Sequence, residues 1–256
     1  LITNNIFSGN RSNNGGGVYT DDTVHATLTN NKFIGNTAWQ QGGGAYLKGA
    51  ATLIGNIFTE NTAQSGGGGA YIDGRATLTN NIFIANTANL GGGVRIQSSA
   101  TLTSNTFCGN SSLVDRGGGA YIVGGIVTLS NNIFTENIAV NEGGGTYIHS
   151  DGSNITNNTF TGNTAGSGGG IYLDLGDNSY TGHLYNNIIW NNTASAGADL
   201  YIDNVADDPF FSVPVTLFNN DFDESASGTY ITSLFPIDPN NLNNIDPQFV
   251  GSGNYH

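Results

Sequence analysis

The stretch ATLIGNIFTENTAQSGGGGAYIDGR, residues 51–75, is followed at once by ATLTNNIFIANTANLGGGVRIQSS, residues 76–99. The second stretch restates the ATL, the NIF, the N-T-A and the glycine run of the first. Self-similarity at a fixed period is typical of repeat architectures, in which each unit is one structural element that stacks on its neighbours. The repeat therefore has to be explained before any single residue is considered.

This period belongs to the whole chain of 256 residues. Glycine runs recur as GGGVY, GGGAY, GGGGAY, GGGVR, GGGAY, GGGTY and GGGIY, and weaken to GADLY near residue 200. The spacings between successive markers of the F-x-x-N pattern are 26, 25, 25, 24, 27, 26, 29 and 33 residues. These markers are Phe7, Phe33, Phe58, Phe83, Phe107, Phe134, Phe160, Ile189 and Phe222.

Apolar residues within each unit alternate with polar ones in short runs, which is the period of β-strands. In ATLT the Leu faces one side and both Thr face the other, whereas in GGGAYI the Ala and Ile share a face that the Tyr does not. Because so short a strand cannot bury its face alone, equivalent strands of successive units must stack in parallel around one core. The sequence predicts an all-β fold, a single-stranded parallel β-helix of about nine coils of about 25 residues. We expect one domain over residues 1–256, with regular coils over 1–202 and irregular, acidic coils over 203–256.

Three repeated features have structural roles in such a coil. The aromatic residues form an internal stack that buries apolar area at about 25 cal/mol per Å²: Phe33, Phe58, Phe83, Phe107, Phe134 and Phe160. The asparagines three positions later form a ladder at a bend, where each amide bonds to backbone and to the next coil: Asn36, Asn61, Asn86, Asn110, Asn137 and Asn163. The glycine triplets suit a sharp corner that requires positive φ or close backbone contact.

The charge distribution excludes one class of partner. The formal net charge is −13, from 6 Lys and Arg against 19 Asp and Glu, which argues against nucleic acid as a partner. All 6 basic residues lie at or before Arg116, where 5 of the acids also lie, so 19 − 5 = 14 acids and no base follow it. The C-terminal half is therefore expected to have an acidic surface.

Cys108 is the single cysteine, which excludes an internal disulfide framework, and we interpret it as a tolerated small residue. No apolar run approaches the roughly 18 residues that a membrane-spanning segment needs, and no basic-then-apolar leader is present. The chain contains no Met and hence no initiator. We expect it to be a processed or excised piece of a longer protein.

The pairing of F-x-x-N-x-A with GG-A-[IVY] resembles the polymorphic outer-membrane protein repeat of bacterial autotransporter-like adhesins. It also resembles the broader pectate-lyase-like right-handed β-helix superfamily, over residues 1–202. The ending NNIDPQFVGSGNYH, residues 243–256, resembles the closing segment of bacterial β-helix surface proteins, which there continues toward a C-terminal anchor. The resemblance implies a right-handed coil and an extracellular or cell-surface location.

Function has to come from the outward columns, because packing explains the inward ones. One column is predicted as an exposed aromatic stripe that contacts a ligand, such as a sugar, or a neighbouring molecule. The alternative is a self-satisfied ladder that only stabilises its own sheet through cross-strand pairs. The column comprises Tyr19, Tyr46, Tyr71, Arg95, Tyr121, Tyr147, Tyr172 and Tyr201.

Two residues after each Tyr, three successive units place His149, Asp174 and Asp203 on the same face. This spacing fits a metal site or a carboxylate pair for glycoside hydrolysis, and the later loops add the calcium-type ligands Asp177, Asp207 and Asp208. The alternative is an acidic solvated rim. We expect no obligatory cofactor, with calcium as the possible ion.

Regular Thr-x-Thr rungs raise a minor alternative, an ice-binding solenoid, although Thr is also what an exposed strand favours. Ile54, Asn154 and His183 interrupt these rungs. The column comprises Thr27, Thr52, Thr77, Thr101, Thr128 and Thr216, with Thr29, Thr79, Thr103 and Thr156 two residues on.

A polysaccharide lyase needs a strong base beside cations, and Lys48, Asp73, Arg75 and Arg95 are the cluster that qualifies. Lys48, Asp73 and Arg95 also fit a ladder of alternating charges, worth under about 1 kcal/mol per exposed pair. Insertions are almost absent from the first seven units and appear only over residues 176–239, whereas enzymes of the resembled fold use long loops to build a cleft.

This regularity favours a non-catalytic structural or adhesive protein: an adhesin, stalk or fibre subunit. Its expected partners are other copies of itself, end to end or side by side, or a cell-surface glycan or protein. The alternative is a polysaccharide-binding or polysaccharide-degrading lyase or hydrolase. Electron microscopy would distinguish these roles: filaments would favour a structural role, and separate rods would favour ligand binding.

Overall fold

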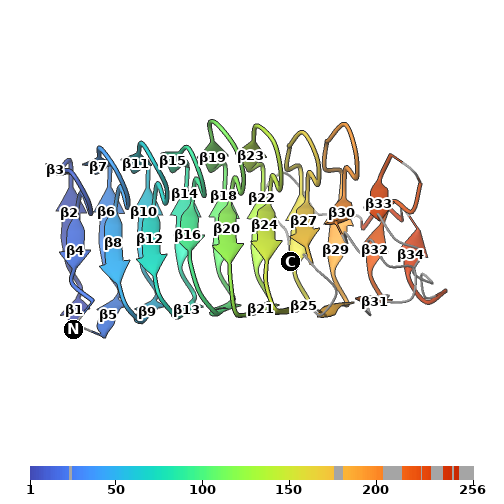
Figure 1. Cartoon of the computed structure of the whole chain (residues 1–256), viewed down its shortest axis with the longest axis horizontal. Coiled ribbons are helices and arrows are strands. Elements are labelled where there is room, and N and C mark those ends of the chain that lie inside the picture. The colour runs from blue at the N-terminus through green and yellow to red at the C-terminus, as the bar shows by residue number, and fades with distance from the viewer. Residues whose placement is uncertain are drawn as a thin grey trace.

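The protein is described by a computed structural model that places residues 1–22, 25–175, 181–203, 215–225, 227–231, 239–243 and 245–247. The placed residues form an all-β, right-handed parallel solenoid of about eight turns, close to the nine coils predicted. Successive coils stand side by side along the long axis, beginning with the N-terminal coil at one end (Figure 1). The predicted fold class is confirmed.

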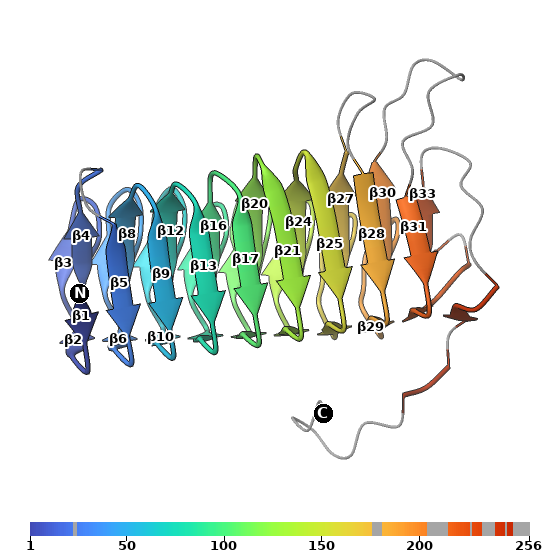
Figure 2. The same ribbon diagram turned by 90° about the horizontal axis from the view of Figure 1, so that it is seen from below.

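Every coil contributes one strand to each of up to four parallel sheets, which we call sheets A to D. Sheet A, which faces the viewer in Figure 2, contains β1 (Ile2–Thr3), β5 (Ala26–Thr29), β9 (Ala51–Ile54), β13 (Ala76–Thr79), β17 (Ala100–Thr103), β21 (Ile126–Ser130), β25 (Gly152–Thr156), β28 (Thr181–Tyr185) and β31 (Val215–Phe218). Sheet B contains β2 (Ile6–Ser8), β6 (Lys32–Ile34), β10 (Ile57–Thr59), β14 (Ile82–Ile84), β18 (Thr106–Cys108), β22 (Ile133–Thr135), β26 (Thr159–Thr161), β29 (Ile188–Trp190), β32 (Asp221–Phe222) and β34 (Leu242–Asn243).

Sheet C is short and contains β3 (Arg11–Ser12), β7 (Thr37–Ala38), β11 (Thr62–Ala63), β15 (Thr87–Ala88), β19 (Ser111–Ser112) and β23 (Ile138–Ala139). Sheet D contains β4 (Val18–Thr20), β8 (Ala45–Lys48), β12 (Ala70–Asp73), β16 (Val94–Ile96), β20 (Ala120–Val123), β24 (Thr146–His149), β27 (Ile171–Asp174), β30 (Leu200–Asp203) and β33 (Thr229–Ile231). We count coils from their sheet A strands, so that coil 5 contains β17–β20 and coil 6 contains β21–β24.

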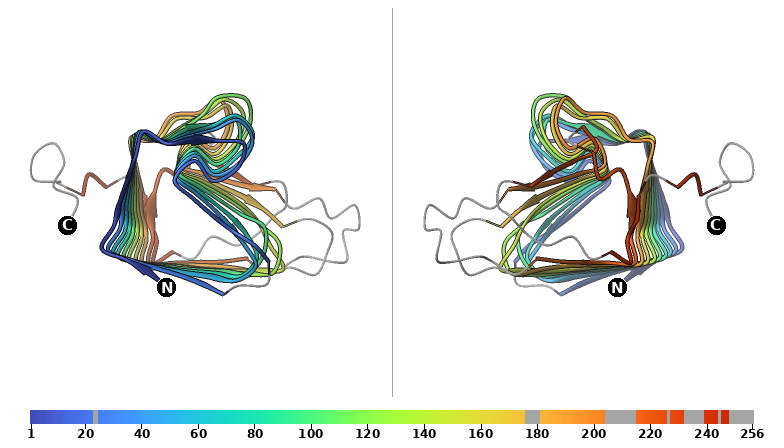
Figure 3. Two further views of the ribbon diagram at one scale, coloured as in Figure 1. Left: turned by 90° about the vertical axis from the view of Figure 1, so that its left-hand side faces the viewer. Right: turned by 90° about the vertical axis from the view of Figure 1, so that its right-hand side faces the viewer.

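Seen along its axis, the coil is a triangle whose sides are sheets A, B and D (Figure 3). At the corner between sheets B and D, the chain in coils 1 to 6 runs through sheet C and then bulges outward before the glycine run. We call this bulge the lobe of the coil. In coil 5 it comprises residues 113–116, and in coil 6 residues 140–142.

The interior is the predicted phenylalanine stack. Neighbouring rings from Phe33 to Phe160 lie 4.5–4.8 Å apart between centroids and within 4° of parallel. These six rings have no exposed surface, and leucines and isoleucines of sheets A and D pack against them. The alternation predicted for ATLT and GGGAYI is confirmed, because Leu78 and Ile72 are in this core and Tyr71 is not.

The predicted asparagine ladder is also present. The side chain of Asn61 donates to Asn86 Oδ1 at 2.9 Å and to the backbone carbonyl of Phe33 at 2.9 Å, and its backbone N–H donates to the same Oδ1 at 3.0 Å. Equivalent bonds join Asn36 to Asn163 through every coil between them. Because each amide serves three backbone or side-chain partners, the ladder leaves few polar groups unpaired inside.

A second asparagine ladder, which the sequence analysis missed, runs parallel to the first at the corner between sheets A and B. In it Asn81 donates to Asn105 Oδ1 at 3.0 Å and to the carbonyl of Leu53 at 2.8 Å. From Asn5 to Asn220 its members stand two residues before the markers of the F-x-x-N pattern, so the repeat contained a signal for it. They are Asn5, Asn31, Asn56, Asn81, Asn105, Asn132, Asn158, Asn187, Asn220 and Asn241.

The glycine run makes the corner where the lobe meets sheet D. Gly67 has φ +67°, in the left-handed region that L side chains rarely adopt. A Cβ on Gly68 would lie 2.4 Å from the carbonyl oxygen of Gly92 in the next coil. The predicted need for positive φ and for close backbone contact therefore holds within the same triplet.

Candidate functional site

The tyrosine column lies, as predicted, on the outer face of sheet D. Strand register places Tyr46 beside Tyr71, Tyr71 beside Arg95 and Arg95 beside Tyr121. It then continues through Tyr147, Tyr172 and Tyr201 to Tyr230. Centroids of neighbouring tyrosine rings lie 4.5–5.4 Å apart.

The expectation that this column is an exposed stripe is wrong for the inner coils. Tyr46, Tyr71, Tyr147 and Tyr172 are all buried, whereas Tyr19, in the first coil, is 48% exposed. The lobes cover the rings: the Arg116 guanidinium of one lobe lies 4.9 Å from the Tyr147 ring centroid. The inner tyrosines therefore form the self-satisfied ladder that was the alternative, and their faces are closed to a stacked sugar. Tyr121, Tyr201 and Arg95 are half-buried.

The cluster considered for a lyase is divided by the fold. Arg95 lies between two rings of the ladder, its guanidinium carbon 5.2 Å from the Tyr71 centroid and 5.5 Å from that of Tyr121. Lys48 and Asp73 are register partners at the ends of their sheet D strands, as the alternating-charge interpretation required, but its third member Arg95 pairs with Tyr71 instead of Asp73. Arg75 instead lies at the start of sheet A, where it lines a different surface. Arg95 is thus part of the ladder's packing.

The three residues predicted as a metal site do lie on neighbouring strands. His149 pairs in register with Asp174, and Asp174 with Asp203. His149 Nδ1 lies 3.1 Å from Asp174 Oδ2, and the Tyr147 hydroxyl donates to the same oxygen at 2.6 Å. The Tyr172 hydroxyl donates to Asp203 Oδ2 at 3.0 Å. The carboxylates are therefore held as acceptors by the tyrosine ladder.

Lobe residues complete this polar cluster. Arg116 Nε lies 2.6 Å from Glu142 Oε2 and 3.5 Å from Asp115 Oδ1. Burial raises the pKa of the Glu142 carboxyl, and Arg116 opposes that increase. Burial also raises the pKa of the Tyr147 hydroxyl well above its ordinary value, and the bond to Asp174 adds to the increase. The tyrosine thus stays a proton donor at any physiological pH, which suits a structural network.

Within the placed ranges, no three His, Cys, Asp or Glu side chains are grouped so that they could hold a metal ion. The loop acids Asp177, Asp207 and Asp208 lie outside the described residues. Calcium binding by this chain therefore stays a prediction.

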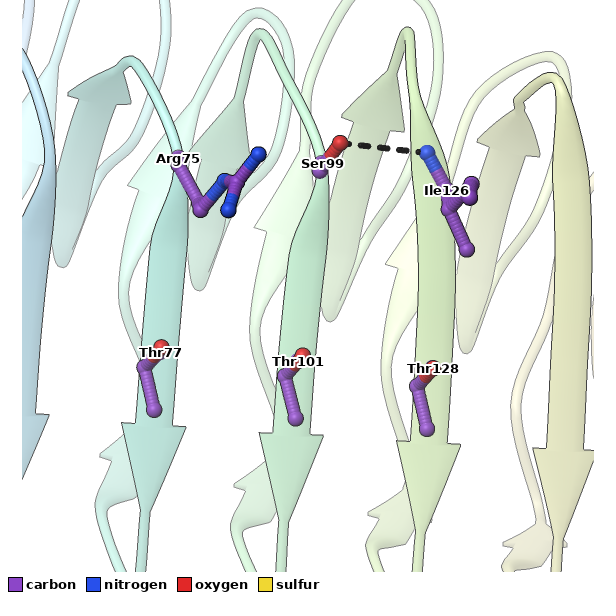
Figure 4. Close-up of a pocket in the computed structure, with 6 residues that line it drawn as sticks. All are labelled: Arg75, Thr77, Ser99, Thr101, Ile126 and Thr128. Carbon is purple, nitrogen blue, oxygen red and sulfur yellow. Dashed lines mark hydrogen bonds between the residues drawn. The ribbon is translucent and has the colours of Figure 1, made fainter.

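A shallow hollow of about 220 Å³ opens on the outer face of sheet A, across coils 4 to 6 (Figure 4). It arises where the small Ser99 stands in register between the longer side chains Arg75 and Ile126. Ser99 Oγ accepts a hydrogen bond from the Ile126 backbone N–H at 3.2 Å. The floor is the predicted threonine column, and the lining residues are Arg75, Thr77, Ser99, Thr101, Ile126 and Thr128.

This lining has a definite chemistry. Four hydroxyl groups offer donors and acceptors, Ile126 offers an apolar edge, and Arg75 offers a planar cation that pairs with carboxylate or sulfate. Such a set fits a polyol that carries an acidic group. Sequence analysis did not predict the hollow, because its depth depends on one small residue between two large ones.

The threonine column itself is in register from Thr27 to Thr128. Asn154 and His183 then interrupt it before Thr216. The uninterrupted part is therefore five rungs long and is indented by the hollow. Ice binding stays an untested alternative for this face.

Comparison with known families agrees with this architecture. The model of the right-handed β-helix region matches residues 1–132, just over half of the chain, and the chain belongs to that family. The model of the Chlamydia polymorphic membrane protein repeat matches residues 159–174, which include Phe160 and the whole sheet D strand of coil 7, β27. No curated protein and no solved structure matches the chain. No helix long and apolar enough to cross a membrane occurs in the part of the chain that the structure places.

Proposed function

We propose that this chain is the rod of a surface-displayed or extracellular β-helix protein, with a structural and adhesive role. The observation that carries the proposal is the continuity of the second asparagine ladder, which joins Asn31 to Asn241 without a break. Each rung ties its coil to the next one by side-chain bonds. A rod built in this way resists local opening and keeps the outer surface in a fixed arrangement.

Two further observations support an outward, surface role. The repeat model that matches residues 159–174 describes a polymorphic membrane protein of Chlamydia, and we transfer from it only a surface location. The outer faces of the inner coils present mostly Thr, Asn, Ser and Ile in place of charged side chains. Of the residues considered for catalysis, Arg95, Asp174 and Asp203 are engaged by the tyrosine ladder.

The proposal is tested with fluorescent beads that carry either this chain or an unrelated acidic protein of similar size. We expect beads with the chain to be retained on a layer of cultured epithelial cells under flow, and the others to wash off. Equal retention of both would contradict the adhesive role. Electron microscopy of the same preparation tests association between copies, with filaments supporting end-to-end or lateral contacts.

The hollow on sheet A favours a second candidate, binding of an acidic glycan. Arg75 is exposed at its edge, and the hydroxyls of Thr77, Thr101 and Thr128 line its floor. We expect binding to a carboxylated or sulfated glycan on an array. The test variant is Arg75→Ser, because Ser99 already occupies the equivalent position of the next coil.

The matched control for that variant is Arg11→Ser, which removes an equal charge from the first coil, far from the hollow. Loss of binding in Arg75→Ser alone would support the site, and equal binding by both variants would exclude it. Release of new reducing ends or unsaturated uronates from the bound glycan would instead establish a hydrolase or lyase.

A further inference from the structure

The lobes of coils 5 and 6, together with Ile138 of the adjoining sheet C strand β23, expose a compact group of aliphatic side chains. Leu113 is 58% exposed, Val114 56%, Ile138 50% and Val140 53%. Strand register places Ile138 beside Ser111, so Leu113 and Val140 follow at equivalent positions of adjacent coils. We call these four residues the aliphatic lobe. Contiguous exposed aliphatic groups of this kind are uncommon on a monomer and mark interaction sites.

The repeat does not account for this group. Where coil 6 has Ile138, coils 2, 3 and 4 have Thr37, Thr62 and Thr87, and coil 7 has Thr164. The lobe of coil 5 is also lengthened, with four residues between Ser112 and the positive-φ Gly117 where the neighbouring coil 4 has two. Neither the inward packing nor the corner geometry needs these changes. The aliphatic substitutions and the longer lobe therefore change only the outer surface.

The aliphatic lobe is held in a fixed shape. Ser112 Oγ donates to the carbonyl of Asn89 at 2.8 Å, and Asn141 Nδ2 donates to Asp115 Oδ1 at 3.1 Å. Arg116 bonds to both Asp115 and Glu142 and lies over the Tyr147 ring. A preorganised surface binds with a smaller entropic cost than one that must be ordered on binding.

The rim of the aliphatic lobe is acidic. Asp115 follows it in coil 5, Glu136 precedes it in coil 6, and Glu142 follows it there. Arg116 is the one base nearby, and its charge is already engaged by two of these carboxylates. No Lys or Arg follows Arg116 in the sequence, so the field on this side of the rod is negative.

We propose that the aliphatic lobe docks a basic amphipathic polypeptide segment, one that presents aliphatic side chains flanked by Lys or Arg. The aliphatic side chains would cover Leu113, Val114, Ile138 and Val140, and the cations would face Asp115 and Glu136. A second copy of this chain is a poorer partner, because its own net charge of −13 repels it. The inference rests on the adhesive function and names the surface and the class of partner that serve it.

The experiment measures fluorescence anisotropy of a labelled peptide of leucines and lysines at helical spacing, titrated with the whole chain. The test variant combines Leu113→Gln, Val114→Ser, Ile138→Thr and Val140→Gln, residue types that other lobes use. We expect the dissociation constant to rise about tenfold or more, because the variant removes the apolar surface that the peptide would bury at about 25 cal/mol per Å². Asp115→Asn with Glu136→Gln should weaken binding less and flatten its salt dependence.

The control variant Ile54→Thr and Ile84→Thr removes two exposed isoleucines from sheets A and B, away from the lobes, and should bind as the natural chain does. Equal affinity of the four-residue variant and this control would overturn the proposal. So would equal binding of a peptide with glutamate in place of lysine, or concentration-dependent dimers of the chain that the four-residue variant abolishes.

The bead assay separates this proposal from the adhesive function. Beads with the four-residue variant should lose retention on cells if the aliphatic lobe is the adhesive surface. Full retention of those beads would overturn the docking proposal and leave the adhesive function standing. Peptide binding through the aliphatic lobe, without retention of beads that carry the natural chain, would support the docking proposal and contradict the adhesive function.

Discussion

Coils 2–4 and the lobes of coils 5 and 6 differ in what their residues do. In coils 2–4 the phenylalanines, asparagines and glycines recur because each one packs on or bonds to its own equivalent in the next coil. The aliphatic lobe of coils 5 and 6 departs from the repeat where no packing demands it, at Leu113, Val114, Val140 and the β23 residue Ile138. The repeated residues are thus the ones that stabilise the solenoid. The residues that depart from the repeat lie on its exposed surface.

The largest expected effect tests the repeated part. Phe83→Ala should lower the free energy of unfolding by about 3–5 kcal/mol, because it removes a fully buried ring between two stacked neighbours and leaves a cavity. Urea unfolding followed by circular dichroism measures the loss. Ile84→Ala is the matched control one residue away, since Ile84 is outward and 38% exposed. Similar losses in the two variants would contradict the assignment of inside and outside.

The next effect tests the ladder. Asn86→Ala should cost about 3 kcal/mol, because Asn61 loses its acceptor and the Phe58 carbonyl loses its donor, each a buried group left unpaired at about 1–3 kcal/mol. The exposed Gln64→Ala should change stability by less than about 0.5 kcal/mol. A cost below about 1 kcal/mol for Asn86→Ala would mean that water enters the ladder and replaces the lost bonds.

The burial of a column could be predicted from the sequence only where its residues contact their own equivalents in the neighbouring coils. The inward columns were predictable because Phe83 lies beside Phe58 and Phe107. Aligning the repeats is therefore enough to identify which residues are in contact. The burial of Tyr147 was not, since alternation tells which side of the sheet a residue faces but not that the Arg116 lobe covers that side. Lobes have no strand periodicity from which such a cover can be predicted.

The candidate sites show the same limit. His149 and Asp174 were correctly predicted to be neighbours, because strand register follows from the repeat. The bond from the Tyr147 hydroxyl to Asp174 and the close approach of His149 to Asp174 depend on side-chain conformations that spacing does not determine. The hollow beside Ser99 depends on a size difference between neighbouring coils, which an alignment of repeats treats as noise.

The pH dependence of stability tests the C-terminal end of the first asparagine ladder, where an aspartate takes the place of an asparagine. There Asp199 replaces the third glycine of the run, and its Oδ1 accepts from Asn192 Nδ2 at 3.0 Å where other coils use an asparagine. Burial raises the pKa of Asp199 from 3.8 to about 6, although its hydrogen bonds from Asn192 and Asp223 oppose the increase.

The folded state therefore binds this proton more tightly than the unfolded state. The contribution of Asp199 to stability is fully present below pH 3.8 and is lost as the pH rises through about 6. Asp199→Asn removes this titration, so its stability relative to the natural chain should rise by about 2–3 kcal/mol between pH 4 and pH 7. Urea unfolding of both proteins at the two pH values measures the difference. Parallel pH profiles would show that Asp199 titrates normally.

The smallest expected effect returns to the lobes. Ile138→Thr with Val140→Gln should leave the free energy of unfolding within about 0.5 kcal/mol of the natural chain, because both side chains are half exposed and substitutions at such surface positions cost little. Phe134→Ala in the same coil should cost about 3–5 kcal/mol. A large loss in the lobe variant would mean that these aliphatic residues support the coil. An unchanged stability means that the solenoid does not need these side chains, as the docking role of the aliphatic lobe requires.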